Sequence, residues 1–159
     1  MSYPEDKIRD YAENLYRRRD SRCTEAVLRT FLDCFETEYD ESVLNLTRGF
    51  PGGMGDAGCS CGAVVGGVMV LGMFFGQNLP KDSPWTSCMK LSKMLHDQFR
   101  ETHKALCCRV LNHGLVHGSP EQRAACTKRI GDATSITLRI MEEEALKRGW
   151  QDKIRCKIV

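Results

Sequence analysis

The stretch from Gly62 to Phe75 limits the fold most strongly, because none of its side chains is charged or polar. A helix that is apolar on every side must be surrounded by other parts of the protein. The apolar core between the flanking breakers covers about 15 residues, whereas a transmembrane helix needs about 20. Gly62 and Gly66 stand four residues apart, a spacing that lets another helix approach closely. The sequence therefore predicts a central helix buried within a bundle.

Apolar residues recur at helical spacing in the segments on both sides of this central helix. We predict helices over five such segments: residues 8–19, 23–34, 40–49, 84–108 and 119–149. The order Ser119-Pro120-Glu121-Gln122 is typical of a helix start, because the serine can cap the helix and the glutamine can complete a capping box. The predicted fold class is all-α, a compact bundle of about five to six helices in a single domain of residues 1–159. Residues 150–159 are expected to form a C-terminal tail that carries Cys156.

The helix predicted over residues 84–108 has a start signal in Asp82 or Ser83, followed by Pro84 at the first helical position. Its apolar face continues to Leu106. The last turn of this helix is therefore expected to carry Cys107 and Cys108.

Nine cysteines in 159 residues are far above ordinary usage. The N-terminal residues Met1 to Lys7 are polar and carry charges of both signs, so they lack the basic and apolar regions of a signal peptide. We therefore expect a cytoplasmic protein, in which surplus cysteines act as metal ligands, redox thiols or small core residues. The formal charge of +2, from 23 basic and 21 acidic residues, gives no reason to expect nucleic acid or a membrane as a partner.

The positions of the cysteines on the predicted helices separate them into groups. Cys34 and Cys88 lie within apolar stripes, where a thiol packs as a small apolar residue. Cys23, Cys61 and Cys126 fall in or near the first turns of helices, where unpaired N–H groups and the positive end of the helix dipole favour a thiolate. Their spacings match no local metal-binding template, so the helix positions alone leave metal binding, redox chemistry and simple packing open.

A glycine-rich loop from Gly49 to Gly58 leads into Cys59-Ser60-Cys61, and we expect no regular structure in it. The N–H groups of such a loop can face the sulfurs of a cluster or an anion. We therefore assign cofactor contacts to five residues of this region: Gly53, Gly55, Gly58, Cys59 and Gly62. The alternative is that the glycines only let the chain pass a crowded helix junction. Residues 53–58 also match G-x-G-x-x-G, but no predicted strand precedes them, so a nucleotide site is not expected.

Other common sites lack support in the sequence. No C-x-x-C-H motif is present, so covalently bound haem is not expected. His113 and His117 are separated by Gly114 in a predicted loop, which favours solvated histidines over a zinc-binding helix face. No Ser-His-Asp arrangement is evident, and no catalytic residue is assigned.

The glycine run from Gly49 to Gly55, followed by Cys61-Gly62-Ala63-Val64-Val65-Gly66, is similar to the central motif of a known group. Around it, Cys23-Thr24-Glu25-Ala26-Val27 is similar to the group's first cysteine with its Ala-Val, Cys108-Arg109-Val110-Leu111 to its Cys-Arg-x-Leu, and Cys126 to its last cysteine. The chain thus resembles the family of redox-active proteins named for the cysteine pattern C-GCAxxG-C-C, over roughly residues 20 to 145. It departs from the pattern at Pro51, at the additional Cys59 and at the doubled Cys107-Cys108.

The resemblance implies a centre of four cysteines, and a related domain in split-Soret cytochromes is associated with iron-sulfur binding. We therefore expect Cys23, Cys61, Cys108 and Cys126 to be thiolate ligands of a 2Fe-2S or 4Fe-4S cluster. The expected function is electron transfer or redox sensing with a redox partner protein. The C-terminal tail and the wide apolar surface of the Gly62 to Phe75 helix leave room for a homodimer. Two alternatives stay open. One is a thiol-disulfide oxidoreductase using the pairs Cys59/Cys61 and Cys107/Cys108, and the other is a structural zinc module.

Overall fold

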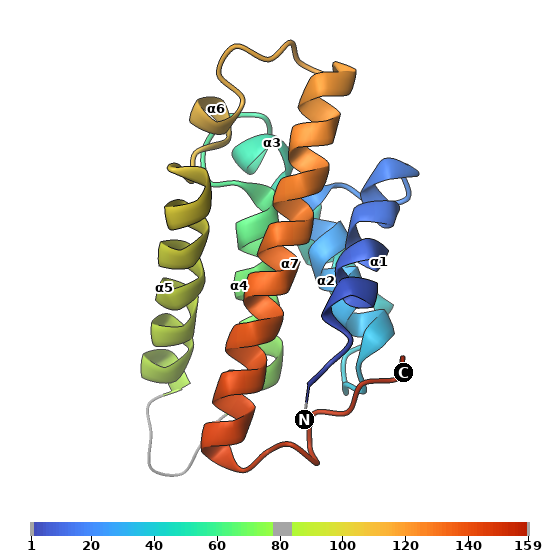
Figure 1. The fold of residues 1–159 in the computed structure, drawn as a ribbon, viewed down its shortest axis with the longest axis vertical. Coiled ribbons are helices and arrows are strands. Elements are labelled where there is room, and N and C mark those ends of the chain that lie inside the picture. Colours follow the sequence, from blue (N-terminus) through green and yellow to red (C-terminus); the bar gives the residue numbers. More distant parts are fainter. Residues whose placement is uncertain (1, 78–83, 159) are drawn as a thin grey trace.

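The computed structural model describes residues 2–77 and 84–158. In these ranges the protein has seven α-helices, one 3-10 helix and no β-strand, which confirms the predicted all-α fold. In chain order the elements are α1 Glu5–Arg17, α2 Cys23–Cys34, η1 Glu41–Thr47, α3 Pro51–Met54, α4 Gly62–Phe75, α5 Pro84–His103, α6 Cys108–Leu111 and α7 Pro120–Arg148. Five long helices form the bundle, and the short α3 and α6 lie together at one end of it (Figure 1).

The apolar helix α4 lies at the centre of the bundle, as its sequence predicts, in contact with α2, α5 and α7. Its glycines make this crowding feasible. A Cβ atom on Gly66 would lie 2.7 Å from the carbonyl oxygen of Thr24 in α2, and one on Gly67 would lie 2.6 Å from Leu95 in α5. Larger side chains at these two positions would push the neighbouring helices outward and lower the packing density of the core.

The long helix α7 shares the central position, because it packs against α1, α2, α4 and α5 along its length (Figure 1). The helix α7 begins and ends where the capping residues in the sequence predict. The Ser119 hydroxyl accepts a hydrogen bond of 3.2 Å from the N–H of Gln122, and Gly149 closes the helix in the left-handed conformation with φ 65°. An ion pair of 2.7 Å between Arg9 and Asp132 joins α1 to it.

The prediction for residues 84–108 was wrong at its end, because α5 stops at His103. Lys104 adopts a left-handed backbone with φ 64°, which ends the helix before the two cysteines. Residues 106–108 then pair antiparallel with the segment after the glycine loop. The N–H of Cys61 donates to the oxygen of Leu106 at 2.7 Å, and Ser60 stands opposite Cys107. Cys108 therefore begins the separate helix α6, while Asp82 and Ser83, the expected caps of α5, lie outside the described residues.

Two smaller segments also differ from expectation. Residues 41–47 form a 3-10 helix in place of an α-helix, capped by the Asp40 carboxylate, which accepts from the N–H of Ser42 at 2.8 Å. The glycine loop, predicted to be irregular throughout, contains the single turn α3, in which Gly52 and Gly53 both have φ 72°. Such positive φ values suit glycine best, and Met54 and Asp56 in the same loop adopt them too, with φ 67° and 60°.

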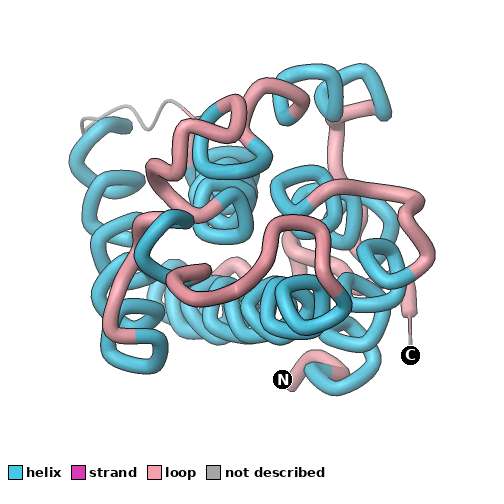
Figure 2. Tube along the Cα trace, turned by 90° about the horizontal axis from the view of Figure 1, so that it is seen from above, coloured by secondary structure: helices cyan, strands magenta, loops and turns pink. Residues whose placement is uncertain are grey.

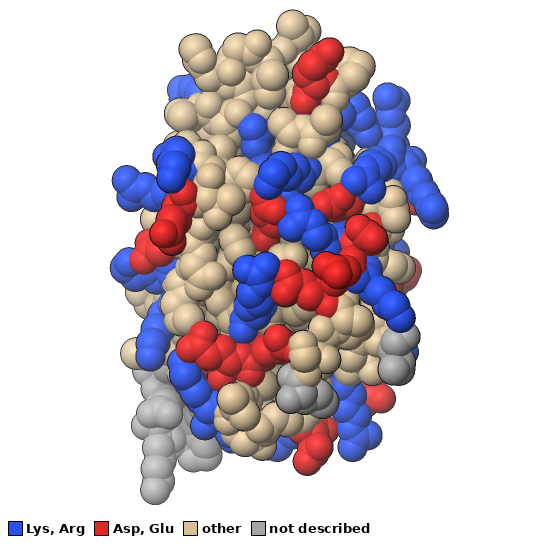
Figure 3. Space-filling model, in the orientation of Figure 1, with Lys and Arg blue, Asp and Glu red and all other residues tan. Residues whose placement is uncertain are grey.

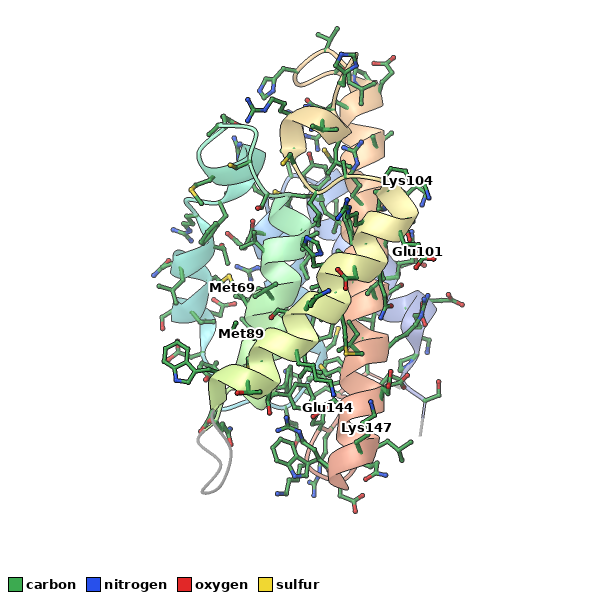
Figure 4. The ribbon with its side chains drawn as sticks, turned by 90° about the vertical axis from the view of Figure 1, so that its left-hand side faces the viewer. Met69, Met89, Glu101, Lys104, Glu144 and Lys147 are labelled. Atoms are coloured by element: carbon green, nitrogen blue, oxygen red, sulfur yellow. The ribbon has the colours of Figure 1, made fainter. Side chains whose placement is uncertain are left out.

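The flank formed by α5 is seen in Figure 4, where this helix runs in front of α4 and α7. Met69 of α4 and Met89 of α5 are labelled where the two helices run alongside each other, and Met89 is exposed. Over the described part of the chain, every helix is too short or too polar to cross a bilayer.

Candidate redox site

Four of the nine cysteines line one cavity of about 390 Å³ at the end of the bundle where α3 and α6 lie. Each comes from a different element: Cys23 begins α2, Cys61 directly precedes α4, Cys108 begins α6 and Cys126 lies in the second turn of α7. The structure thus brings together the four cysteines that were assigned to one centre, although 103 positions separate the first from the last.

The other five cysteines lie outside this cavity. Cys59 and Cys107 are exposed, on the paired segments that precede α4 and α6. Cys34 is fully buried in the hydrophobic core, and Cys88 packs partly buried against it, as the apolar stripes predict. Cys156 is held in the C-terminal tail, where it pairs with Phe35.

Three long helices, α2, α4 and α7, begin at the end of the bundle that holds the cavity (Figure 1). Seen from above, loops cross this end of the molecule (Figure 2). The first N–H groups of each helix have no partner within the helix, and the positive ends of the three dipoles point to the same region. The bundle therefore offers an environment that favours negative charge next to the sulfurs.

Burial is the main influence on the pKa values of three of these thiols. Cys61 is only 7% exposed, and burial raises its pKa to about 12 although the amides of Ala63 and Val64 favour the thiolate. Burial likewise raises the pKa of Cys23, against the effect of the Gly52 amide, and the pKa of Cys108. Without a bound cation these three groups are therefore protonated thiols at neutral pH, and binding of a metal must release their protons.

We expect Cys61 to resist alkylation in the reduced, metal-free protein. With a pKa of about 12 its thiolate is scarce at pH 8, so iodoacetamide should modify it at least ~100-fold more slowly in the native protein than in urea. The rate should continue to rise with pH up to about 12, whereas the rate of an ordinary thiol, with a pKa of about 8.5, levels off near about pH 10.5. Peptide mass spectrometry over a time course measures both effects. Equal rates in native and denatured protein would show that the thiol is neither buried nor shifted.

The glycines assigned as cofactor contacts differ in how closely they pack and in whether they line the cavity. Gly62 lines the cavity, and a side chain there would collide with the sulfur of Cys23. A Cβ atom on Gly53 would lie 2.8 Å from Cys108, and one on Gly58 would lie 2.7 Å from Arg109, so these two glycines seat α6 on the loop. A Cβ atom on Gly55 would meet no atom within 4 Å, and Gly55 does not line the cavity.

Cys59, the last of the five assigned contacts, also lies outside the cavity. Its main chain nevertheless supports the site, because its oxygen accepts a hydrogen bond of 2.6 Å from the N–H of Cys108. Gly52, which was not among the assigned contacts, does line the cavity. The loop thus contributes Pro51, Gly52 and Asp56 to the cavity wall, and Gly62 lines the cavity from the first turn of α4.

A polar network that the sequence gave no reason to expect joins two of the sulfurs. The amide of Asn112 donates to the Cys108 sulfur at 3.2 Å, and its oxygen accepts from Arg129 at 2.6 Å. The same guanidinium nitrogen lies 3.9 Å from the Cys126 sulfur, and the other donates to the oxygen of Leu111 at 2.5 Å. Asn112 follows Cys108 by four residues and Arg129 follows Cys126 by three, so helical spacing is the one signal that could have indicated both.

Tyr16 and Arg123 complete the side of the cavity next to Cys126, and the sequence contains no signal for either. Burial, with the neighbouring Cys126, raises the pKa of Tyr16, so its phenol stays protonated. The Arg123 guanidinium lies 5.0 Å from the centre of the Tyr16 ring and donates to the Tyr16 carbonyl at 3.1 Å. His117 also lines the cavity, and its side chain is exposed. His113 does not line the cavity.

The sulfurs share the cavity without meeting at a single point. Among the described residues, no group of three or more His, Cys, Asp or Glu side chains is arranged so that it could hold one metal ion. One tetrahedral zinc would need its four sulfurs within about 4 Å of each other, because each zinc–sulfur bond is about 2.3 Å. The four sulfurs therefore do not form a ready single-ion site among the described residues.

Comparison with known proteins gives one finding. A model of the family described as "Putative redox-active protein (C_GCAxxG_C_C)" matches residues 21–140, a range that contains all four cavity cysteines. Comparisons with curated proteins and with solved structures found no match.

Proposed function

Because the chain belongs to the C_GCAxxG_C_C family of redox-active proteins, we propose that it is an iron-sulfur protein whose cluster is bound by Cys23, Cys61, Cys108 and Cys126. The observation that carries this proposal is the shared cavity. Of the nine cysteines, these four line it and the other five do not. Chance placement of apolar core thiols would not separate the cysteines in this way.

The donor set fits a cluster better than it fits the zinc alternative. Four thiolates are the usual ligands of both 2Fe-2S and 4Fe-4S clusters. Each iron of a cluster is bound by its own cysteines, so the sulfurs stand farther apart than around one ion, and the cavity of about 390 Å³ leaves space between them. This agrees with four sulfurs that face one volume without forming a single-ion site among the described residues.

The surrounding residues have defined tasks in this proposal. A cluster bound there would supply one-electron transfer. Asn112 donates to the Cys108 sulfur, and the Arg129 cation lies beside the Cys126 sulfur. Both would stabilise added negative charge on a cluster held there and raise its reduction potential. The bundle beneath the cavity keeps Cys61 from water.

Anaerobic purification tests the proposal directly. The protein should contain iron and acid-labile sulfide, and it should show the broad visible absorption of a cluster that bleaches on reduction. Chemical reconstitution with iron and sulfide under reducing conditions is the necessary second step for protein that loses its cluster. Colourless, iron-free protein after reconstitution would contradict the proposal.

A second candidate, thiol-disulfide exchange, is favoured by the exposure of Cys59 and Cys107. Their segments run side by side, joined by the hydrogen bond from Cys108 to the Cys59 carbonyl. In such a reaction one thiolate attacks a substrate disulfide, and a second thiol resolves the mixed disulfide that forms. Turnover of a disulfide substrate by iron-free protein, abolished in Cys59→Ser, would support this candidate. Unchanged turnover in that variant would argue against it.

A further inference from the structure

The cavity is lined by four arginines as well as by four cysteines: Arg19, Arg22, Arg123 and Arg129. None of them forms an ion pair within the described chain, although six other arginines there do. Asp56 is the one carboxylate among the described lining residues, and it lies folded against Gly52. The described lining residues thus place four guanidinium groups against a single carboxylate, which leaves the arginine charge largely unbalanced.

The four arginines differ in depth. Arg129 is 9% exposed and contacts Asn112, Leu111 and the Cys126 sulfur, so its charge acts on the sulfurs inside the cavity. Arg123 is half-buried on the Tyr16 ring. Arg19 and Arg22 are exposed, and neither guanidinium makes a hydrogen bond or an ion pair within the described residues. Both line the cavity from its exposed side. Figure 3 shows Lys and Arg side chains gathered at the upper right, over the end of α1 and the start of α2.

The backbone at Arg19 adds an independent observation. Its φ of 63° lies in the left-handed region, which costs a residue with a Cβ atom roughly 1–2 kcal/mol and suits glycine better. The turn that it forms is fixed by the N–H groups of Asp20 and Ser21, which donate to the Leu15 carbonyl at 3.0 and 3.2 Å. An arginine therefore occupies a strained position, facing the cavity, with no protein partner for its charge among the described residues.

We propose that the mouth of the cavity binds a small anion through a carboxylate, phosphate or sulfur oxyanion group, held by Arg19, Arg22 and Arg123 above the four sulfurs. Guanidinium groups match the geometry of these anions with paired hydrogen bonds. The convergent N-termini of α2, α4 and α7 add to the favourable field. The proposal goes beyond the iron-sulfur function, because it concerns arginines at the rim and holds for the cavity with or without iron.

Calorimetry on the protein as purified provides the first test. Sulfate, inorganic phosphate and acetate are titrated at constant ionic strength against a chloride background. At least one of the three should bind with a stoichiometry of one per chain, and the double substitution Arg19→Gln/Arg22→Gln should weaken it by about five-fold or more. The control is Arg18→Gln, since Arg18 is exposed at the same helix end but does not line the cavity. Binding of sulfate and phosphate without acetate would define a tetrahedral anion, and binding of acetate a carboxylate.

A second measurement places the anion over the sulfurs. In reduced, iron-free protein, each thiol is alkylated with anionic iodoacetate and with neutral iodoacetamide, and the ratio of the two rates is taken by peptide mass spectrometry. This ratio cancels differences in thiolate content. It should be several-fold higher at Cys23 and Cys126 than at the exposed Cys59 and Cys107, and it should fall in the double variant but not in Arg18→Gln.

Three results would overturn the proposal. They are binding no stronger than that of chloride, equal effects of the double substitution and of Arg18→Gln, and rate ratios at the cavity thiols that match those at Cys59 and Cys107. All measurements can be made on protein that proves unable to bind iron, so failure of the iron-sulfur proposal and failure of the anion site are distinguishable.

Discussion

Serine in place of Cys23, Cys61, Cys108 or Cys126 is expected to remove the cluster from otherwise folded protein. Each substitution deletes one of the thiolates that line the cavity, and loss of a direct ligand should lower iron affinity more than the roughly 10- to 100-fold typical of groups around the ligands. Iron content, acid-labile sulfide and visible absorption after identical reconstitution measure the loss, and circular dichroism confirms that the variants remain helical.

The remaining cysteines supply matched controls for this series. Cys59→Ser and Cys107→Ser alter exposed thiols, and Cys34→Ala removes a buried sulfur without introducing a buried hydroxyl. All three should keep the iron content of the unmodified protein. If Cys59→Ser or Cys107→Ser lost iron while its neighbour Cys61→Ser or Cys108→Ser kept it, the ligand assignment would have to move to the exposed residue.

Alanine at Gly53 is expected to destabilise the fold by about 3 kcal/mol or more, because two costs combine. The residue has φ 72°, and a Cβ atom would lie 2.5 Å from both the N and the O atoms of Cys59. Neither atom can move away easily, because both belong to the main chain of Cys59, which is hydrogen-bonded to Cys108. The free energy of unfolding in urea measures the effect.

Gly55 is the matched control, two residues away in the same loop. It has φ 62°, but a Cβ atom added there would have no neighbour within 4 Å, so Gly55→Ala should cost only the backbone strain of about 1–2 kcal/mol. The difference between the two variants isolates the steric cost of filling the space between the loop and α6. Equal losses would mean that the loop moves freely and does not seat α6.

The bundle was predictable from the sequence where one physical pattern decided it. The apolar run of α4 could only be buried, and the capping signals at Ser119 and Gly149 placed both ends of α7. The end of α5 was missed because apolar spacing continues through Leu106, although the chain turns at Lys104 and Leu106 then pairs with Cys61. Apolar periodicity indicates which residues can face the core, but it does not indicate where a helix ends and the next segment begins.

The candidate site was predictable in its cysteines and not in its polar surroundings. Helix positions indicated Cys23, Cys61 and Cys126, and resemblance to the family supplied Cys108. Arg129 and Asn112 stood at helical spacing from cysteines, but their meeting required the packing of α6 against α7. Tyr16 and Arg123 lie 107 positions apart in the sequence, and only the contact of α1 with α7 brings them together.

The origin of the cavity from four separate elements has a thermodynamic consequence. Cysteines in a local C-x-x-C pair can bind a metal in an unfolded chain, but Cys23, Cys61, Cys108 and Cys126 meet only when α2, α4, α6 and α7 are already assembled. Any cofactor that this cavity binds therefore binds the native state selectively, and its binding free energy adds to the free energy of unfolding. The unfolding midpoint should then increase with the concentration of free cofactor. Oxidative or chelating conditions that remove the cofactor should lower the unfolding midpoint, because the binding free energy is then lost.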